Sequence, residues 1–199
     1  MKKLLLFTTL SAITVIMATP TLALQFENEK DAEAYFAEEA RIWQKIRENM
    51  EKGKTDSDAL GKAIDIIFDL HLMGTMDNPV LYTQKHMKEV EISQEQQIKT
   101  LERMTRERLT AIEKDEKINT TVHVVHLLPM LGAISDYDML PILKECALSK
   151  DNRIRANTLE ITEKIITKLE EKKQTADVEK FATFLKEMKQ AEQKEQEKP

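Results

Sequence analysis

Two histidines and a methionine are the residues of this sequence whose spacing best suits chemistry. His123, His126 and Met130 lie three and four positions apart, so on a helix they fall within about 60° of one another. They flank an apolar stripe that contains Val122 and Val125. Two imidazoles and a thioether are soft ligands, and on one flank they could hold Cu(I). The alternative interpretation is half-buried helix residues without a metal.

No other set of residues indicates a reaction. Cys146 shares the apolar part of an expected helix with Met139 and Ile142, which indicates a packed thiol and not a nucleophile. It is the single cysteine, so it cannot form an intrachain disulfide. The chain has no G-x-S-x-G, H-E-x-x-H, P-loop or E-x-x-H arrangement. Acid pairs such as Glu38 and Glu39 are expected to lie on solvent-exposed helix faces. The sequence therefore predicts no catalytic residue and no cofactor.

The first 23 residues are predicted to be a secretory signal peptide. Lys2 and Lys3 precede an uncharged, mostly apolar stretch over 4–17, and Thr21 and Ala23 are small enough for the two specificity positions of a signal peptidase. The apolar stretch is shorter than the roughly 20 residues that span a bilayer. We expect cleavage after Ala23 and an exported protein, periplasmic or else extracellular. An uncleaved membrane anchor is the alternative.

The charge balance of the rest of the chain is acidic. The whole sequence has 30 basic and 35 acidic residues, and the signal segment takes two of the basic ones, which leaves 28 against 35 and a net charge of −7. Binding to nucleic acid or to an anionic membrane needs a basic face. We expect neither partner, and no membrane association once the signal is removed.

Helix-forming residues dominate the chain, and no stretch alternates with period two. The sequence therefore predicts an all-α protein of about seven or eight helices. Phe36, Trp43 and Met50 recur every seven residues in an expected helix over 29–52. The segment 58–74 is apolar nearly all round, which is typical of a helix packed between neighbours.

One domain is expected over 24–190, because a chain of this length can bury a core without disulfides. Ser93 and Gln96 form a capping box that starts one of its helices. The end of the chain, QAEQKEQEKP, has balanced charges and almost nothing to bury. The sequence predicts a charged, flexible tail over 191–199.

Three helix starts resemble one another. DNPVLYT begins at Asp77, DEKINTT at Asp115 and DNRIRAN at Asp151, each with Ile or Val three positions after the aspartate. The separations are 38 (115 − 77) and 36 (151 − 115) residues, and each start follows another amphipathic helix. Periods of this size are typical of stacked helix hairpins that share one core. The alternative is an irregular helical bundle, in which similar spacings arise by chance.

The segment LLPMLGAISDYDMLPILKECALSKDNRIRANTLEITEKI, residues 127–165, resembles a HEAT repeat. It has a Leu-Gly pair that closes one helix, an early proline at Pro141, and a turn at Asp151 that leads through Arg155 into a second helix. The resemblance implies a stacked α-solenoid in which Asp151 and Arg155 hydrogen-bond within and between neighbouring repeats. The earlier units have Leu81 and Asn119 at the arginine position, so a continuous ladder is not expected.

These features favour an exported protein that binds or scaffolds another protein, because the HEAT resemblance implies protein binding and no shared catalytic residues. We expect the second helices of the hairpins to form the binding surface, with the flank of His123, His126 and Met130 as one strip. A periplasmic copper-binding protein that uses these three residues is the alternative function. An enzyme of unidentified class is the second alternative.

Overall fold

The computed structural model describes residues 29–54, 56–114 and 120–196, and this part of the chain folds into eight helices without a strand. The predicted all-α class is confirmed. The helices are α1 (Glu29–Glu51), α2 (Ser57–Leu72), α3 (Pro79–Glu89), α4 (Gln94–Glu113), α5 (Thr120–Gly132), α6 (Leu140–Ala147), α7 (Asn152–Glu171) and α8 (Thr175–Gln196).

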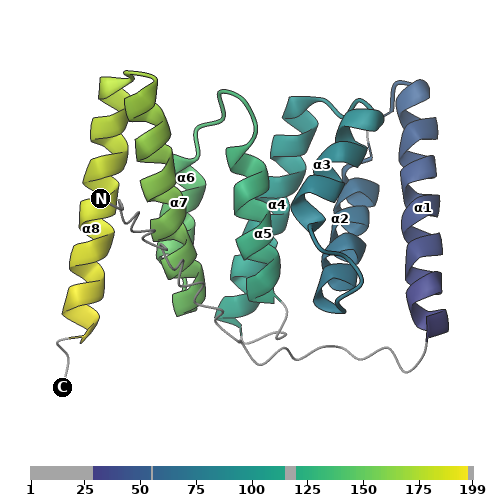
Figure 1. The fold of residues 1–199 in the computed structure, drawn as a ribbon, viewed down its shortest axis with the longest axis horizontal. Coiled ribbons are helices and arrows are strands. Elements are labelled where there is room, and N and C mark those ends of the chain that lie inside the picture. The colour runs from purple at the N-terminus through teal and green to yellow at the C-terminus, as the bar shows by residue number, and fades with distance from the viewer. Residues whose placement is uncertain (1–28, 55, 115–119, 197–199) are drawn as a thin grey trace, which may run out of the picture.

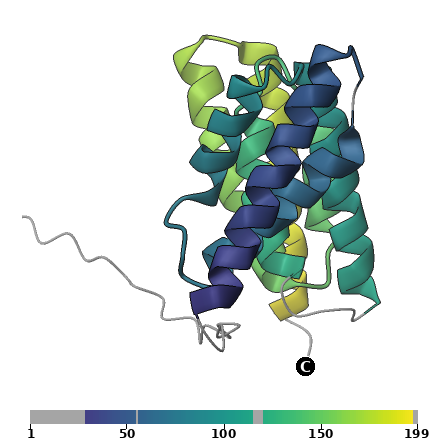
Figure 2. The same cartoon turned by 90° about the vertical axis from the view of Figure 1, so that its right-hand side faces the viewer.

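The helices stand in a row, with α1 at one end and α8 at the other (Figure 1). Neighbours in sequence pack together: α1 with α2, α4 with α5, and α7 with α8. Contacts of α2 with α4, and of α5 with both α3 and α7, join one pair to the next. Figure 2 shows α1 lying across the end of the row. The fold is therefore a stack of helix pairs that share one core.

Side-chain caps begin the helices near the predicted positions. Asp56 caps α2 by accepting from the backbone N–H of Ala59 at 2.8 Å. The predicted capping box of Ser93 and Gln96 is present at the start of α4. Each cap satisfies a backbone donor that has no partner within the first helical turn. These starts depend on residues close in sequence, which explains why the sequence predicted them.

Asn78, and not Asp77, caps α3. Its side chain accepts from the N–H of Leu81 at 3.0 Å, while Asp77 is exposed one position earlier. Pro79 is the reason, because a proline at the first helical position makes the residue directly before it the cap. The corresponding Asp115 lies outside the described residues, so its predicted role stays a prediction.

Helix α2 is the centre of the core, as its apolar sequence predicted. Ala63, Ile64, Ile67, Phe68 and Leu70 are fully buried along it. Because successive residues point in different directions, these side chains pack against helices on several sides. The polar residues of this helix therefore also lie close to neighbouring helices.

The predicted apolar stripe of α1 is wrong in part. Trp43 is buried with Ile42 and Ile46, but Phe36 is 37% exposed. The buried face follows the helical period of 3.6 residues, whereas a seven-residue spacing is kept only in a supercoiled pair. Glu39, predicted to be solvated, is 4% exposed, and burial raises the pKa of its carboxyl.

The last helix is longer than the sequence predicted. Helix α8 continues to Gln196, well into the segment predicted as a flexible tail. Phe181, Phe184 and Met188 are buried along it, and their spacing anchors the first turns against α7. The helical backbone then continues through residues with high helix propensity. Residues 197–199 lie outside the described part of the chain.

Candidate functional site: a buried histidine cluster between α2 and α5

Three of the four histidines gather around the fully buried ring of Phe68. Its centroid lies 5.4 Å from that of His123 and 5.3 Å from that of His126. The ring of His71 lies 5.0 Å from His126. Helix α2 supplies Phe68 and His71, and α5 supplies the other two. Each pair has i, i+3 spacing, which places both members on one face of their helix.

His123 lies between two carboxylates of α2. Its Nδ1 is 3.5 Å from Oδ1 of Asp65, and its Nε2 is 3.4 Å from Oδ1 of Asp69. Neither contact has hydrogen-bond geometry, so both are ion-pair contacts. Burial favours the neutral ring, but the two carboxylates outweigh it and raise the pKa of His123. The protonated ring suits this position, because it presents a positive N–H to each carboxylate.

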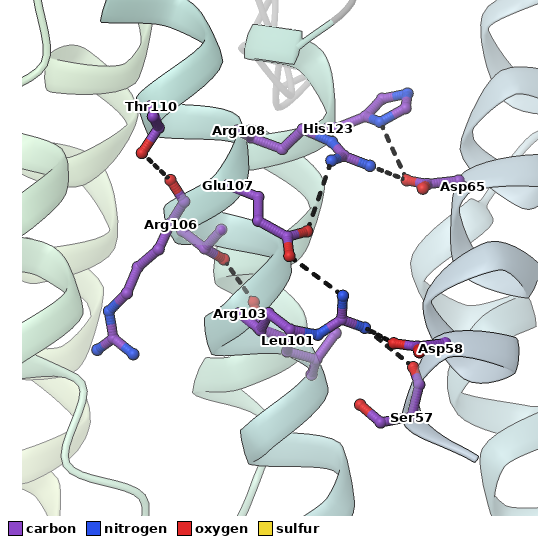
Figure 3. Close-up of polar contacts among 11 residues, drawn as sticks. Ser57, Asp58, Asp65, Leu101, Arg103, Arg106, Glu107, Arg108, Thr110 and His123 are labelled. Atoms are coloured by element: carbon purple, nitrogen blue, oxygen red, sulfur yellow. Dashed lines mark hydrogen bonds and ion pairs between the residues drawn. The ribbon is translucent and has the colours of Figure 1, made fainter.

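Asp65 also joins α2 to α4. Nη2 of Arg108 lies 2.5 Å from Oδ1 of Asp65, and Figure 3 shows His123 and Arg108 meeting this carboxylate. Burial alone would raise the pKa of Asp65, but the contacts with His123 and Arg108 lower it. Asp65 is therefore a carboxylate that holds α4 and α5 to the same face of α2.

A more exposed set of ion pairs continues along α4 (Figure 3). Arg103 contacts Asp58 at 3.3 Å, Glu107 at 3.1 Å and the carbonyl oxygen of Ser57 at 3.1 Å. These contacts join the start of α2 to the middle of α4. Because Asp58 is 92% and Glu107 is 49% exposed, each of these ion pairs contributes little stability by itself.

The surroundings of His126 keep its ring neutral, and a backbone carbonyl fixes a hydrogen bond of His71. Burial first, and then the charges of His71 and His123, lower the pKa of His126 to about 4, so its ring is neutral near pH 7. The Nε2 of His126 is buried without a hydrogen-bond partner. Nδ1 of His71 lies 2.6 Å from the carbonyl oxygen of Met76. Because a carbonyl only accepts, that nitrogen donates the hydrogen bond.

The predicted flank of His123, His126 and Met130 is not a surface strip. His123 is 7% and Met130 is 1% exposed, so the predicted recognition strip is wrong. The buried face of α5 includes Val124, whereas Val125 of the expected stripe is only half-buried. Because α5 is apolar on most sides, its sequence pattern does not determine which side faces the core.

Copper binding by these residues stays a prediction. Both ring nitrogens of His123 face carboxylates of α2, whereas Met130 lines a separate hollow with Gln84 and Gln97. In the described ranges, no group of three or more His, Cys, Asp or Glu side chains is placed to hold a metal ion. Stoichiometric Cu(I) binding that is lost on replacing His123 and His126 would be its test.

The sequence contains a signal for polar partners of His123, but it does not identify them. Asp65 and Asp69 are spaced i, i+4 in a segment of the helix, residues 63–70, whose other residues are all apolar. Two acids on one face of a buried helix need cations from a neighbouring helix. The signal indicates that a partner exists, but it does not say that His123 and Arg108 are the partners.

The cysteine is a packed thiol. Cys146 is fully buried in α6, and burial raises the pKa of its thiol to about 12. A thiol is a far weaker nucleophile than a thiolate. The position that its apolar neighbours predicted is confirmed.

Asp151 caps α7 as predicted, but its arginine partner is a different residue. Its carboxylate accepts from the backbone N–H of Arg153 at 2.9 Å and pairs with the Arg153 side chain at 3.0 Å. Thr121 of α5 also donates to it, which joins neighbouring helix pairs. Arg155 instead donates to the carbonyl oxygen of Ser149 at 2.8 Å. Arg153 lies in the first turn and reaches back to the cap, whereas Arg155 lies a further half-turn along.

Replacing Asp151 with alanine is expected to lower the free energy of unfolding by about 1–2 kcal/mol, because α7 loses its cap and α5 loses a hydrogen bond. Burial opposes ionisation, but the bonds from Arg153 and Thr121 outweigh it and lower the pKa of Asp151 to about 2. The difference in unfolding free energy between the wild type and the variant should therefore have its full size above pH 3.8, and it should shrink as the pH falls toward 2. Urea denaturation of the variant measures it. Asp77→Ala is the control, and an equal loss there would contradict the assignment.

The histidine cluster should give the folded protein a stability maximum near pH 6.5. Folded His126 has a pKa of about 4, below the ordinary 6.5, so its contribution is present above pH 6.5 and is lost as the pH falls toward 4. The pKa of folded His123 lies above 6.5, so its contribution is present below pH 6.5 and is lost as the pH rises through that pKa.

Urea denaturation across pH 4–8 separates the two histidines by comparison with the wild type. His126→Leu should remove the rise in stability between pH 4 and 6.5, and His123→Gln should remove the fall above it. His86→Gln is the matched control, because His86 contacts Trp43 and Tyr82 and lies outside the cluster. Wild-type and His123→Gln curves that run parallel above pH 6.5 would contradict the role of His123.

No family model, curated protein or solved structure matches the chain. None of the helices in the described part is both long and apolar enough to cross a membrane. The fold and site together define an all-helical protein of stacked helix pairs, in which the titratable groups around Phe68 join helices to one another.

Proposed function

We propose that this chain is an exported helical-repeat protein, built from HEAT-like hairpins, that binds another protein. The observation that carries the proposal is the row of paired helices, which presents an elongated surface made of many helix faces (Figure 1). Such a surface binds a partner through shape and apolar contact and needs no reactive group. The resemblance of residues 127–165 to a HEAT repeat supports the same function.

The ends of the row support a self-contained stack. Helix α1 exposes Arg41 and Lys45, and α8 exposes Lys186 and Lys189. Polar outer faces on the terminal helices keep a helical-repeat protein soluble, because each internal repeat would otherwise expose an apolar face.

The histidine cluster supports binding over catalysis. His123 of α5 contacts Asp65 of α2, and Arg108 of α4 contacts the same carboxylate. These charged groups neutralise one another and hold α2, α4 and α5 together, which is a structural use of titratable residues. Catalysis would instead need polar groups that converge on a space open to a substrate.

Export is tested by the first residue of the mature protein. The predicted signal peptide lies outside the described residues, so this part of the proposal depends on the sequence. N-terminal sequencing of protein from the exported fraction should begin at Leu24, directly after Ala23. A protein retained in the cell with its first residues intact would contradict export.

Protein binding is tested in the exported fraction with the full chain, tagged at its C-terminus. Chemical cross-linking through surface lysines should give one partner in a fixed ratio, with cross-links that map to the long sides of the row. Mass spectrometry identifies both the partner and the linked lysines. A chain that stays monomeric and carries no cross-linked protein would contradict the proposed function.

A further inference from the structure

A groove of about 700 Å³ lies at the C-terminal end of the row, between the end of α6 and the last turns of α8. Phe184 and Met188 of α8 form its buried apolar floor. Leu148, directly after α6, lines the rim and is 86% exposed, more than any other large apolar side chain in the described ranges. An exposed leucine alone is ordinary, but one beside an apolar floor extends a binding surface.

The groove is elongated along α8. The residues of α8 that line it lie at positions 184, 187, 188, 191 and 192, which form one face of the helix. From 184 to 192 the rise along the helix is about 12 Å, or roughly two turns. A groove of this length suits two turns of another helix, which would place apolar side chains on the floor at i, i+3 and i+4.

The two walls of the groove carry opposite charges. The basic lining residues are Lys144 of α6, Lys150 of the turn that follows and Arg155 of α7, whereas the acidic lining residues, Glu187 and Glu192, both belong to α8. A compact apolar ligand would gain nothing from this separation of charge. A helix with an apolar edge between an acidic flank and a basic flank would match the floor and both walls.

We propose that this groove binds an amphipathic helical segment of the partner protein, with its apolar edge on Phe184 and Met188. Its acidic flank faces Lys144 and its basic flank faces Glu187. This inference rests on the proposed function, because it names the surface and the chemistry of the partner. Turning a bound helix end to end exchanges its two flanks, so a helix with one acidic and one basic flank matches the groove in only one of the two directions.

Three labelled synthetic peptides of about 16 residues test the match by fluorescence anisotropy with the full mature chain. All carry the same leucine edge; one has an acidic and a basic flank, one has two acidic flanks and one has two basic flanks. The mixed peptide should bind about tenfold more tightly than either of the others. In the double variant Glu187→Lys/Glu192→Lys both sides of the groove become basic, so the peptide with two acidic flanks should bind most tightly.

The contribution of the rim is tested by Leu148→Ser, which should weaken binding of the mixed peptide about tenfold. Leu81→Ser is the matched control, because Leu81 is 63% exposed on α3, away from the groove. Both leucines are exposed, so neither variant should unfold the chain. Equal binding of all three peptides, no binding of any, or binding that survives Leu148→Ser would overturn the inference.

Sedimentation of the wild type and of Leu148→Ser tests whether a second copy of this chain occupies the groove. A wild-type dimer that Leu148→Ser dissociates would assign the groove to self-association and overturn the inference. A partner that cross-links only to α3 and α5, without peptide binding at α8, would overturn this inference and leave the proposed function standing. Absence of any partner, with the three peptides still bound unequally, would overturn the proposed function and leave only the preference of the groove for a mixed-charge helix.

Discussion

Replacing Phe68 with alanine is expected to lower the free energy of unfolding by about 3–5 kcal/mol. The ring is fully buried at the centre of α2 and contacts the rings of His123 and His126 on α5. Its removal leaves a cavity between two helix pairs, and the surrounding rings are too rigid to fill it. Urea denaturation at pH 7 measures the loss.

Phe36→Ala is the control for this variant, because Phe36 is 37% exposed and its loss should cost less than about 1 kcal/mol. A second readout is the titration of His126, observed by NMR. The cavity should admit water, so the pKa of His126 should rise from about 4 toward 6.5. Equal losses for Phe68→Ala and Phe36→Ala would contradict the central position of Phe68.

Replacing Arg108 with methionine is expected to cost about 2 kcal/mol of unfolding free energy. Its guanidinium lies 2.5 Å from the carboxylate of Asp65, and the two side chains are 22% and 35% exposed. Removal of one partner from a buried pair costs about 3–5 kcal/mol, while a solvent-exposed pair contributes at most about 1 kcal/mol. A half-buried pair should fall between these values. His123 still contacts Asp65, which limits the loss.

A double-mutant cycle isolates this pair. Asp65→Asn and Arg108→Met should each destabilise the protein, and the double variant should lose less than the sum of the two. Lys164→Met is the comparison for an exposed pair, because Lys164 and Glu160 are 66% and 60% exposed, and it should cost no more than about 0.5 kcal/mol. An Arg108→Met loss as small as that of Lys164→Met would contradict the role of Arg108.

The helices themselves could be predicted because their signals are local. The capping box of Ser93 and Gln96 was expected to start a helix, and it starts α4. A cap and the apolar residues of the next turns lie within a few positions of one another, so their meaning does not depend on the rest of the fold. The same locality explains why Asp151 was correctly expected to cap α7.

The candidate site was only half predictable. The sequence singled out His123 and His126 as chemically notable, and the structure places both against Phe68. It did not identify Asp65 and Arg108 as partners, because those residues lie on other helices and meet His123 only after α2, α4 and α5 pack. No periodic pattern within one helix encodes such a meeting.

The sequence alone determined the all-α class, the order of the helices and several of their starts, because propensity, caps and prolines act over a few residues. The tertiary structure decided which side of each helix is buried. Helix α5 is apolar on most sides, so contacts with α2 and α4, and not its own pattern, turned His123 inward and left Val125 half-buried. Packing of distant segments likewise formed the groove beside Leu148, since its floor lies on α8 and its rim directly follows α6.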